Sequence, residues 1–213
     1  MFHSLWLLRR KIREISFRPA LGYATKMMYR KLFSRRDIIF TLCLSDWEIT
    51  PPEWLPSFSA YPLYSLGHLS EAERETLLEY GGDRIVEDFA TKFARGGTPW
   101  VGRIKGQLAG VCWVFPASIS LDYFFPLLEG DAVISTCFTI PRHRRKGVFS
   151  GILYHIAKTG SKEGLRRVFI NCKIWNVASI RGILKVGFKE IAVVNSVRIA
   201  RQKITIWHRP DLK

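Results

Sequence analysis

The chain has 213 residues, 47% of them hydrophobic, and its 33 lysines and arginines exceed its 18 acidic residues, for a net charge of +15. This size predicts a globular fold whose core needs no disulfide or metal. The four cysteines are scattered without a CxxC pair, which argues against a zinc site or disulfide framework and favours a reducing, cytoplasmic compartment. No stretch approaches ~18 consecutive apolar residues, so we expect no membrane-spanning helix.

The excess positive charge is concentrated at the N-terminus. Residues 1–36 carry ten cations and one acid, whereas residues 37–213 carry 23 cations and 17 acids. We therefore divide the chain into a basic N-terminal arm, residues 1–36, and a domain, residues 37–213. Part of the arm is predicted to be an amphipathic helix, because arginines lie beside a stripe of apolar residues at helical spacing. The stripe consists of Leu5, Leu8, Ile12 and Ile15.

The composition of the arm leaves its partner open. Its cations follow the apolar stretch LWLL instead of preceding it, unlike those of a secretory signal. An arginine-rich segment with Phe, Trp and Leu suits an anionic membrane surface, and equally suits packing on the domain or on another chain. RNA is less favoured, because basic and aromatic residues do not alternate. A mitochondrial presequence has a similar composition.

The domain begins with a β-branched and aromatic run, residues 37–47, which predicts a strand. A proline-rich stretch, residues 50–67, is expected to be irregular. Residues 68–97 predict two helices divided by a Gly-Gly pair. The first of these helices opens with a capping box formed by Ser70 and Glu73.

The middle of the domain predicts a hairpin followed by a strand and a helix. Residues 98–115 form two apolar runs around Lys105–Gly106, which is a hairpin pattern. Residues 116–130 are aromatic and are expected to form a loop over the sheet. A strand is predicted at residues 131–140 and a helix at residues 147–164.

The last part of the domain predicts a strand at residues 166–174 and an Asn-capped helix at residues 176–186. Two antiparallel strands follow within residues 188–207, with the turn at Asn195–Ser196 or at Ala200–Gln202. This order of strands and helices predicts a mixed α/β domain whose central strands are joined by helical crossovers.

A basic run, PRHRRKG, separates the central strand from the helix that starts near Gly147. The first N–H groups of a helix have no internal partner and carry the positive end of its dipole, so they bind phosphate. Gly147 would let the backbone approach a ligand closely, and the cations add longer-range attraction. We therefore predict a cradle for the phosphates of a small molecule, since a nucleic-acid face spreads its cations along a surface.

Two motifs resemble those of the GCN5-related N-acetyltransferase (GNAT) superfamily. The first, R/Q-x-x-G-x-G/A, is matched at residues 144–149, with phenylalanine in place of the last small residue. The second, N-x-x-S/A before a helix that ends in G-F, is matched by Asn176, Ser179 and residues 187–188. The resemblance covers residues 37–208. It implies an α/β GNAT fold, with a mixed central β-sheet flanked by helices.

The resemblance implies an N-acetyltransferase that uses acetyl-CoA or another acyl-CoA. An amine would attack the thioester directly, and the expected acceptor is a primary amine on a small molecule or on an envelope or polysaccharide precursor. The cofactor would enter a splay between the strands at residues 131–140 and 166–174. The implied cofactor-binding residues lie on the central strand, in the basic turn and at two helix starts. They are Phe138, Thr139, Ile140, Arg144, Arg145, Lys146, Gly147, Val148, Phe149, Ser150, Asn176 and Ser179.

The resemblance leaves the catalytic groups less defined. A backbone N–H near Thr139 would polarise the thioester carbonyl. Relatives often have a tyrosine seven residues after the motif asparagine, which acts as a general acid for the departing thiol. This chain has Ile183 at that position. Cys172, Tyr154 or a water molecule are the substitutes that we consider. Packing or surface roles are expected for the nearby histidines. The candidates for the base, which must take the ammonium proton of the acceptor, are Asp131, Asp122 and Glu129.

The acceptor is not defined by the sequence. Aromatic side chains in the segments that form acceptor pockets in this superfamily would suit a sugar, a base or an acyl chain, and equally a core. Two other function classes stay open: a catalytically degenerate protein that binds CoA or a partner, and a basic nucleic-acid-binding protein. The C-terminal strands could also pair between two subunits as a homodimer. The aromatic residues are Trp54, Tyr61, Tyr64, Tyr123, Phe124 and Phe125.

Overall fold

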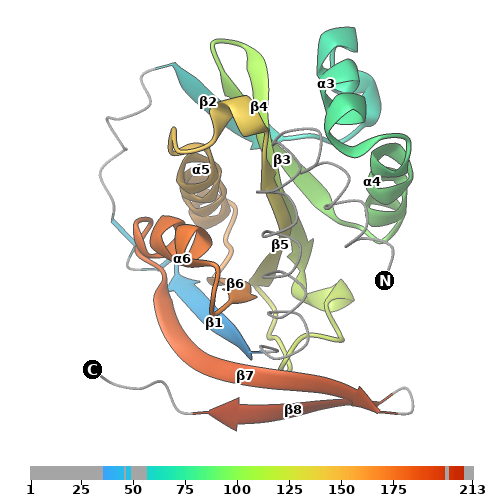
Figure 1. Ribbon diagram of the computed structural model, residues 1–213. Coiled ribbons are helices and arrows are strands. Elements are labelled where there is room, and N and C mark those ends of the chain that lie inside the picture. The colour runs from blue at the N-terminus through green and yellow to red at the C-terminus, as the bar shows by residue number, and fades with distance from the viewer. Residues whose placement is uncertain (1–35, 46, 49–56, 200–201, 209–213) are drawn as a thin grey trace, which may run out of the picture.

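The domain is built on a twisted sheet, which Figure 1 shows in a computed structural model that describes residues 36–45, 47–48, 57–199 and 202–208. Within these residues the strand order is β2-β3-β4-β5-β6-β1-β7-β8, and β5 and β6 are the parallel pair among antiparallel neighbours. The strands are β1 (Arg36–Cys43), β2 (Phe58–Pro62), β3 (Thr98–Ile104), β4 (Gln107–Pro116), β5 (Asp131–Thr139), β6 (Arg167–Lys173), β7 (Lys189–Ile199) and β8 (Gln202–His208).

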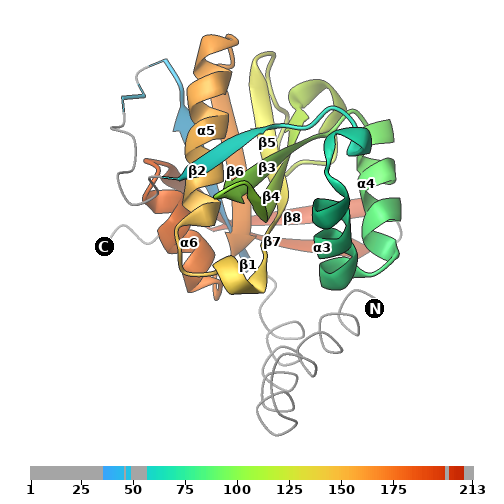
Figure 2. The same ribbon diagram turned by 90° about the horizontal axis from the view of Figure 1, so that it is seen from above.

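Helices cover both faces of the sheet (Figure 2). On one face α5 (Val148–Lys162) packs against β2, β3 and β4, with α6 (Val177–Leu184) beside it. On the other face α3 (Glu71–Gly81) and α4 (Arg84–Ala94) cover β3 and β4. This arrangement confirms the predicted mixed α/β fold. Short 3-10 turns are η1 (Leu66–His68), η2 (Ala117–Ile119) and η3 (Pro141–His143).

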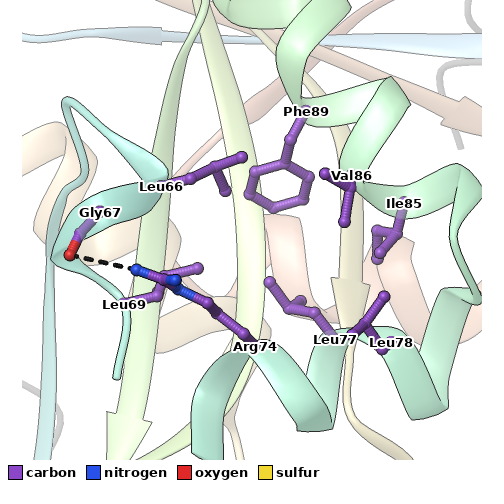
Figure 3. A pocket seen from close by; sticks show the side chains of 9 residues that line it. All are labelled: Leu66, Gly67, Leu69, Arg74, Leu77, Leu78, Ile85, Val86 and Phe89. Atoms are coloured by element: carbon purple, nitrogen blue, oxygen red, sulfur yellow. Dashed lines mark hydrogen bonds between the residues drawn. The ribbon is translucent and has the colours of Figure 1, made fainter. Parts of the chain in front are cut away.

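The packing of α3 and α4 on the sheet is apolar at its centre. Leu77 of α3 and Phe89 of α4 are buried between the two helices and the sheet (Figure 3). Phe89 meets Trp113 of β4 edge to face, with ring centroids 5.0 Å apart. Such aromatic pairs add about 1 kcal/mol to the burial itself, so this contact holds α4 against the sheet.

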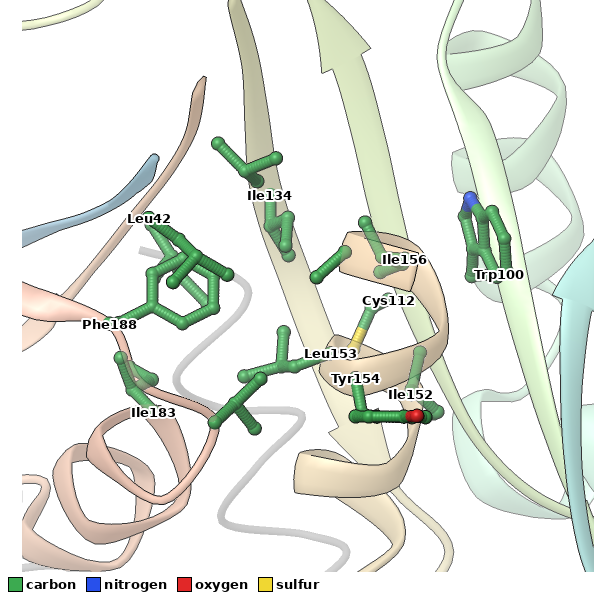
Figure 4. Packing of buried hydrophobic residues seen from close by; sticks show 14 of the residues in the cluster. Leu42, Trp100, Cys112, Ile134, Ile152, Leu153, Tyr154, Ile156, Ile183 and Phe188 are labelled. Atoms are coloured by element: carbon green, nitrogen blue, oxygen red, sulfur yellow. The ribbon is translucent and has the colours of Figure 1, made fainter. Parts of the chain in front are cut away.

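A larger apolar cluster lies between the sheet and α5 (Figure 4). Ile152, Leu153 and Ile156 of α5 are at most 2% exposed and pack in one cluster with Phe40 of β1 and Ile134 of β5. Each fully buried side chain of this size contributes about 2 kcal/mol. The cluster therefore fixes the position of α5 relative to the end of β5, where the basic run lies.

A buried ion pair fastens α3 to β3. Glu73 closes the predicted capping box with Ser70, and it also accepts hydrogen bonds from Arg103 Nε at 2.5 Å and from Arg103 Nη2 at 3.0 Å. Burial alone would raise the pKa of Glu73. The hydrogen bonds from Arg103 and from the Ser70 backbone outweigh burial and hold that pKa below its ordinary value of 4.5.

The structure differs from the sequence prediction in one strand. Residues 50–67 were expected to be irregular, but Phe58–Pro62 forms the edge strand β2, paired with β3. An edge strand tolerates proline, because N–H groups on its outer side need no partner in the sheet. The hairpin turn at Lys105–Gly106 is confirmed, with φ angles of 50° and 77°.

The C-terminal hairpin follows the second of the two predicted alternatives. Strand β7 continues through Asn195–Ser196 to Ile199, and β8 restarts at Gln202. The basic arm lies outside the described residues, apart from Arg36 at the start of β1. In the part of the chain that is described, no helix is both long and apolar enough to cross a membrane.

We expect Glu73→Gln to lower the free energy of unfolding by about 3 kcal/mol, because it leaves Arg103 buried without its anion. The stabilisation from this carboxylate should be present above about pH 4.5 and be lost as the pH falls through the lowered native pKa. Urea denaturation between pH 3 and pH 7 measures both effects. Glu71→Gln, at an exposed neighbour, is the control; an equal loss in the two variants would contradict the assignment.

Candidate functional site

The site is created where β5 and β6 separate. The two strands pair from Asp131 with Arg167 to Ile134 with Ile170, and no further pair follows. Immediately beyond Ile134, the pairing of β5 with β4 shifts register by one residue, opposite Cys112, and Thr136 adopts a φ of 48°. Such a bulge bends the strand. It therefore turns the second half of β5 away from β6 and opens a split between them.

The backbone of β5 presents hydrogen-bonding groups to this split. Ile140, the residue after β5, donates its N–H to the carbonyl of Ala109 in β4 at 2.8 Å, so this N–H is not available to a ligand. Successive peptide groups of a strand point in opposite directions, so the N–H of Thr139 faces the split. The predicted role of Ile140 in cofactor binding is thus not supported by its backbone, and its side chain is buried in the core beneath α3 and α4.

The basic run forms a turn whose backbone suits an anion. It contains η3, then Arg145 with a φ of 62°, then Gly147 with a φ of 79° at the N-cap of α5. A left-handed φ is unfavourable for arginine and costs on the order of 1 kcal/mol. Such residues in a turn make successive N–H groups converge into a concavity that binds anions. The predicted phosphate cradle therefore has a backbone basis at two positions, Arg145 and Gly147.

A cavity of 410 Å³ joins the end of β5, the basic turn and the start of α6. It brings together nine of the twelve predicted cofactor-binding residues. Of the remaining three, Ile140 is buried, and Lys146 and Asn176 flank the cavity without lining it. The lining consists of Cys137, Phe138, Thr139, His143, Arg144, Arg145, Gly147, Val148, Phe149, Ser150, Ala178, Ser179 and Gly182.

The unusual phenylalanine of the first motif is accommodated by a glycine in α6. A side-chain carbon at Gly182 would lie 2.8 Å from Cδ1 of Phe149, so the ring occupies the space that a larger residue would need. Ser150 was expected to offer its hydroxyl to the cofactor. Instead its Oγ donates to the Gly182 carbonyl at 3.0 Å. The pair Phe149 and Ser150 thus fastens α5 to α6 at the cavity.

His143 lines the cavity, although the sequence indicated only a packing or surface role. It is 6% exposed, and its Nε2 accepts a hydrogen bond from Nε of Arg142 at 3.3 Å. Burial lowers the pKa of His143, and the nearby charges of Lys146 and Arg142 lower it further. Both effects favour the neutral imidazole, whose Nε2 is the atom that accepts from Arg142.

Asn176 acts as the predicted cap of α6. Its side-chain oxygen accepts the Ser179 N–H at 3.3 Å, and its own N–H donates to the Lys173 carbonyl at 2.8 Å. Ser179 in turn lines the cavity. Asn176 therefore positions the first turn of α6 at the open end of the split.

The catalytic candidate Asp131 lies at the other end of β5. It is 2% exposed, pairs with Arg167 through contacts of 2.7 and 2.9 Å, and accepts the Leu128 N–H at 2.8 Å. Eight residues of strand separate it from Thr139, about 25 Å. Asp131 thus lies at the end of β5 where the strand is paired with β6, and Glu129 lies two residues before it in the chain. The structure does not bring either carboxylate to the cavity.

The substitutes for the missing tyrosine are also placed by the structure. Ile183 is fully buried in the core under α5, and Tyr154 packs in the same cluster against Trp47, outside the cavity. Cys172 lies on β6. Burial raises the pKa of the Cys172 thiol to about 12, with further contributions from Asp37 and Glu190. Because an ordinary thiol has a pKa of about 8.5, proton transfer from Cys172 to a departing thiolate is uphill.

A polar cluster that the sequence analysis missed lies beside the split. Asp37 of β1 is 5% exposed and accepts hydrogen bonds from Lys173 Nζ at 2.7 Å and from Asn171 Nδ2 at 3.4 Å. Asn171 and Lys173 belong to the part of β6 that no longer pairs with β5. By strand alternation the three side chains point away from α5. A charged residue inside the apolar run of β1 was the available sequence signal.

The predicted acceptor-pocket aromatics serve different purposes. Tyr123, Phe124 and Phe125 pack on the sheet with Phe169 of β6, as a small core beneath the loop. Burial and the neighbouring Asp37 raise the pKa of Tyr123. Tyr61 and Tyr64 are exposed, while Trp54 lies outside the described residues.

Comparison with known proteins agrees with this geometry. A sequence model of the acetyltransferase (GNAT) family matches residues 58–188. Among curated protein sequences, none matches the chain significantly.

Solved structures with the same fold come from distant proteins. A GCN5-related N-acetyltransferase from Sphaerobacter thermophilus shares 13% identity over 88% of this chain, with a TM-score of 0.51. A GNAT-family acetyltransferase from Colwellia psychrerythraea shares 13% over 82%, with a TM-score of 0.53. A glucosamine N-acetyltransferase region of a fungal β-N-acetylglucosaminidase shares 11% over 84%, with a TM-score of 0.53. The chain spans 57%, 56% and 23% of these proteins, respectively.

We expect Gly182→Ala to weaken acetyl-CoA binding at least tenfold, because the added methyl group displaces Phe149 into the cavity or moves α6. Calorimetric titration measures the affinity. Phe149→Ala in the same chain should restore binding by making room for the methyl group. Unchanged affinity in the Gly182→Ala variant would contradict the proposed role of this contact in shaping the cavity.

Proposed function

Because the chain belongs to the acetyltransferase (GNAT) family, we propose that it transfers an acyl group, in the first instance acetyl, from acetyl-CoA to an amine. One observation carries this proposal. The open split, the anion-binding turn and the start of α6 border a single cavity. Acetyl-CoA has a pyrophosphate at one end and a thioester at the other. The cations and backbone N–H groups of the turn suit the pyrophosphate, and the backbone of β5 suits the arm that carries the thioester.

The residues of the chain divide the binding of this donor between them. The turn at Arg145 and Gly147, with Arg144 and Lys146 nearby, would hold the phosphates by backbone N–H groups and charge. The strand segment from Cys137 to Thr139 would hydrogen-bond the amides of the pantetheine arm. Acetyl-CoA itself supplies an activated thioester, which attack by the amine cleaves to an amide and a thiol.

The transition state would be stabilised from β5. Attack of the amine nitrogen on the thioester carbon places negative charge on the carbonyl oxygen, and the Thr139 N–H is the donor that faces the split. The carbon–sulfur bond then breaks and the thiolate leaves. With a thiol pKa of about 8.5, this leaving group departs without a dedicated acid, more slowly than with one.

A base must remove the proton of the ammonium acceptor, and we assign this role to Asp37. It borders the split on the face opposite α5, whereas the phosphate turn lies at the start of α5. The acceptor would therefore enter from the opposite face to the donor, and its ammonium would take the place of the Lys173 amine beside the carboxylate. Lys173 is the more exposed partner of this pair, at 42% against 8%.

The acceptor we propose is a primary amine on a small molecule or on an envelope or polysaccharide precursor. Its support is the cationic arm, which would contact an anionic membrane surface at its cytoplasmic side. Flotation with phosphatidylglycerol vesicles that persists after deletion of residues 1–36 would contradict the membrane part of this proposal.

We expect Gly147→Glu to abolish acetyl-CoA binding, because it adds a side chain and a negative charge at the left-handed N-cap of α5. Calorimetric titration checks this. Gly164→Glu is the matched control, since Gly164 has a φ of 82°, follows the other end of α5 and has open space around it. The proposed function is wrong if the wild type does not bind acetyl-CoA, and the cradle is wrong if both variants bind alike.

We expect Asp37→Asn to lower the rate of acetyl transfer to amines by at least about 100-fold, as removal of a general base does. Asp131→Asn is the matched control, because it also breaks a buried ion pair on the same sheet. Rates measured with a panel of primary amines are normalised to the acetyl-CoA-binding sites found by calorimetry. An equal loss in the two variants would refute the assignment, and full binding without any turnover by the wild type would indicate a CoA-binding protein that does not catalyse.

A further inference from the structure

A second hollow lies away from the cofactor cavity, between η1, α3 and α4 (Figure 3). We call it the α3–α4 groove. Its volume is 370 Å³, and apart from one arginine and one glycine its lining is apolar. The lining consists of Leu66, Gly67, Leu69, Arg74, Leu77, Leu78, Ile85, Val86 and Phe89.

The apolar lining of this groove is open to solvent. Leu78 of α3 is 39% exposed and Val86 of α4 is 45% exposed, and both line the groove (Figure 3). Contiguous exposed apolar surface of this kind marks a place where another group binds. Leu77 and Phe89 form the floor, and their burial in the core makes the groove a fixed feature of the fold.

The two helices that line the groove carry a net negative charge in a strongly basic protein. Residues 71–94 carry seven acidic and three basic side chains, although the whole chain has a net charge of +15. Glu73 is paired with Arg103 and Asp88 with Lys92, which leaves five acidic residues, Glu71, Glu75, Glu79, Asp83 and Glu87, against two arginines, Arg74 and Arg84. Arg74 donates to the Gly67 carbonyl at 3.5 Å. An anionic lipid or phosphate compound is therefore repelled from this surface. A cationic amphipathic segment matches both its charge and its apolar floor.

We propose that the N-terminal arm of the same chain occupies the α3–α4 groove. Its apolar stripe, Leu5, Leu8, Ile12 and Ile15, would lie on the groove floor, as amphipathic helices do in helix-in-groove recognition. The nine cations of residues 1–35 would complement the net negative charge of the two helices. This docking concerns a surface distinct from the cofactor cavity and does not depend on the proposed activity.

The chain length permits this contact. The residues between Ile15 and Arg36 reach about 70 Å when extended, whereas a domain of this size has a radius of gyration of about 15 Å. The effective concentration of a tethered segment is in the millimolar range, so weak docking suffices to fill the groove. A membrane that binds the arm would then have to compete with the groove for the same residues.

Photo-crosslinking of the full chain tests the proposal. The photoreactive residue p-benzoylphenylalanine replaces Val86 at the groove, or Val177 of α6 as a control. Both are helical valines of similar exposure, 45% and 51%, and they lie on opposite faces of the sheet. We expect the probe at residue 86 to cross-link within residues 1–20 of its own chain, at a yield at least fivefold above that of the control. Mass spectrometry of a mixture of ¹⁵N-labelled and unlabelled protein separates links within a chain from links between chains.

Charge-reversal variants provide a second test of the proposal. Glu79→Lys combined with Glu87→Lys should lower the yield at residue 86 severalfold, whereas Glu163→Lys, beyond α5, should leave it unchanged. Leu8→Glu should lower it in the same way. The proposal is overturned if the probe at residue 86 links to residues 1–20 no more than the probe at residue 177 does. It is also overturned if the links join two different chains, because the occupant is then a second copy.

Discussion

The separation of β5 from β6 is the constraint on which the rest of the site depends. These strands are parallel, so they need a crossover, and α5 supplies it. The C-terminal ends of both strands and the N-terminus of α5 consequently meet at one edge of the sheet. A parallel pair would normally continue its ladder there. The bulge at Thr136 ends the ladder after Ile134 and leaves backbone donors unpaired. The split, the phosphate turn and the start of α6 are then neighbours by topology.

Local strain and close packing finish the cofactor cavity. Arg145 is held in a left-handed conformation two residues before Gly147, which adopts it easily, and this indicates that the turn is shaped for a purpose other than stability. The ring of Phe149 on α5 packs into the space that the missing side chain of Gly182 leaves on α6. The bulky motif residue therefore does not fill the cavity. In this chain, the space for the phenylalanine of the motif thus comes from a glycine on the neighbouring helix.

Two buried ion pairs of the sheet lie at opposite ends of the split. Asp131 with Arg167 secures the paired end of β5 and β6, and Asp37 with Lys173 lies beside the open end. The two ion pairs resemble each other in burial but lie at different ends of the strands that form the split. Ile183 and Cys172 leave the reaction without a good proton donor, so the proposed chemistry depends on the oxyanion donor and on the base.

The sequence by itself determined the order of the elements apart from β2, the cap at Asn176, the capping box at Ser70, the hairpin at Lys105–Gly106 and the position of the basic turn before α5. Each of these depends on residues close together in the chain, whose conformational preferences act locally. Only the tertiary structure decided that Ile140 and Asp131 lie away from the cavity, that His143 and Gly182 line it, and that Asp37 meets Lys173. These facts depend on strand register, on a one-residue bulge and on packing between distant segments. A shift of one residue reverses the face of every side chain in a strand, and local sequence does not specify such a shift.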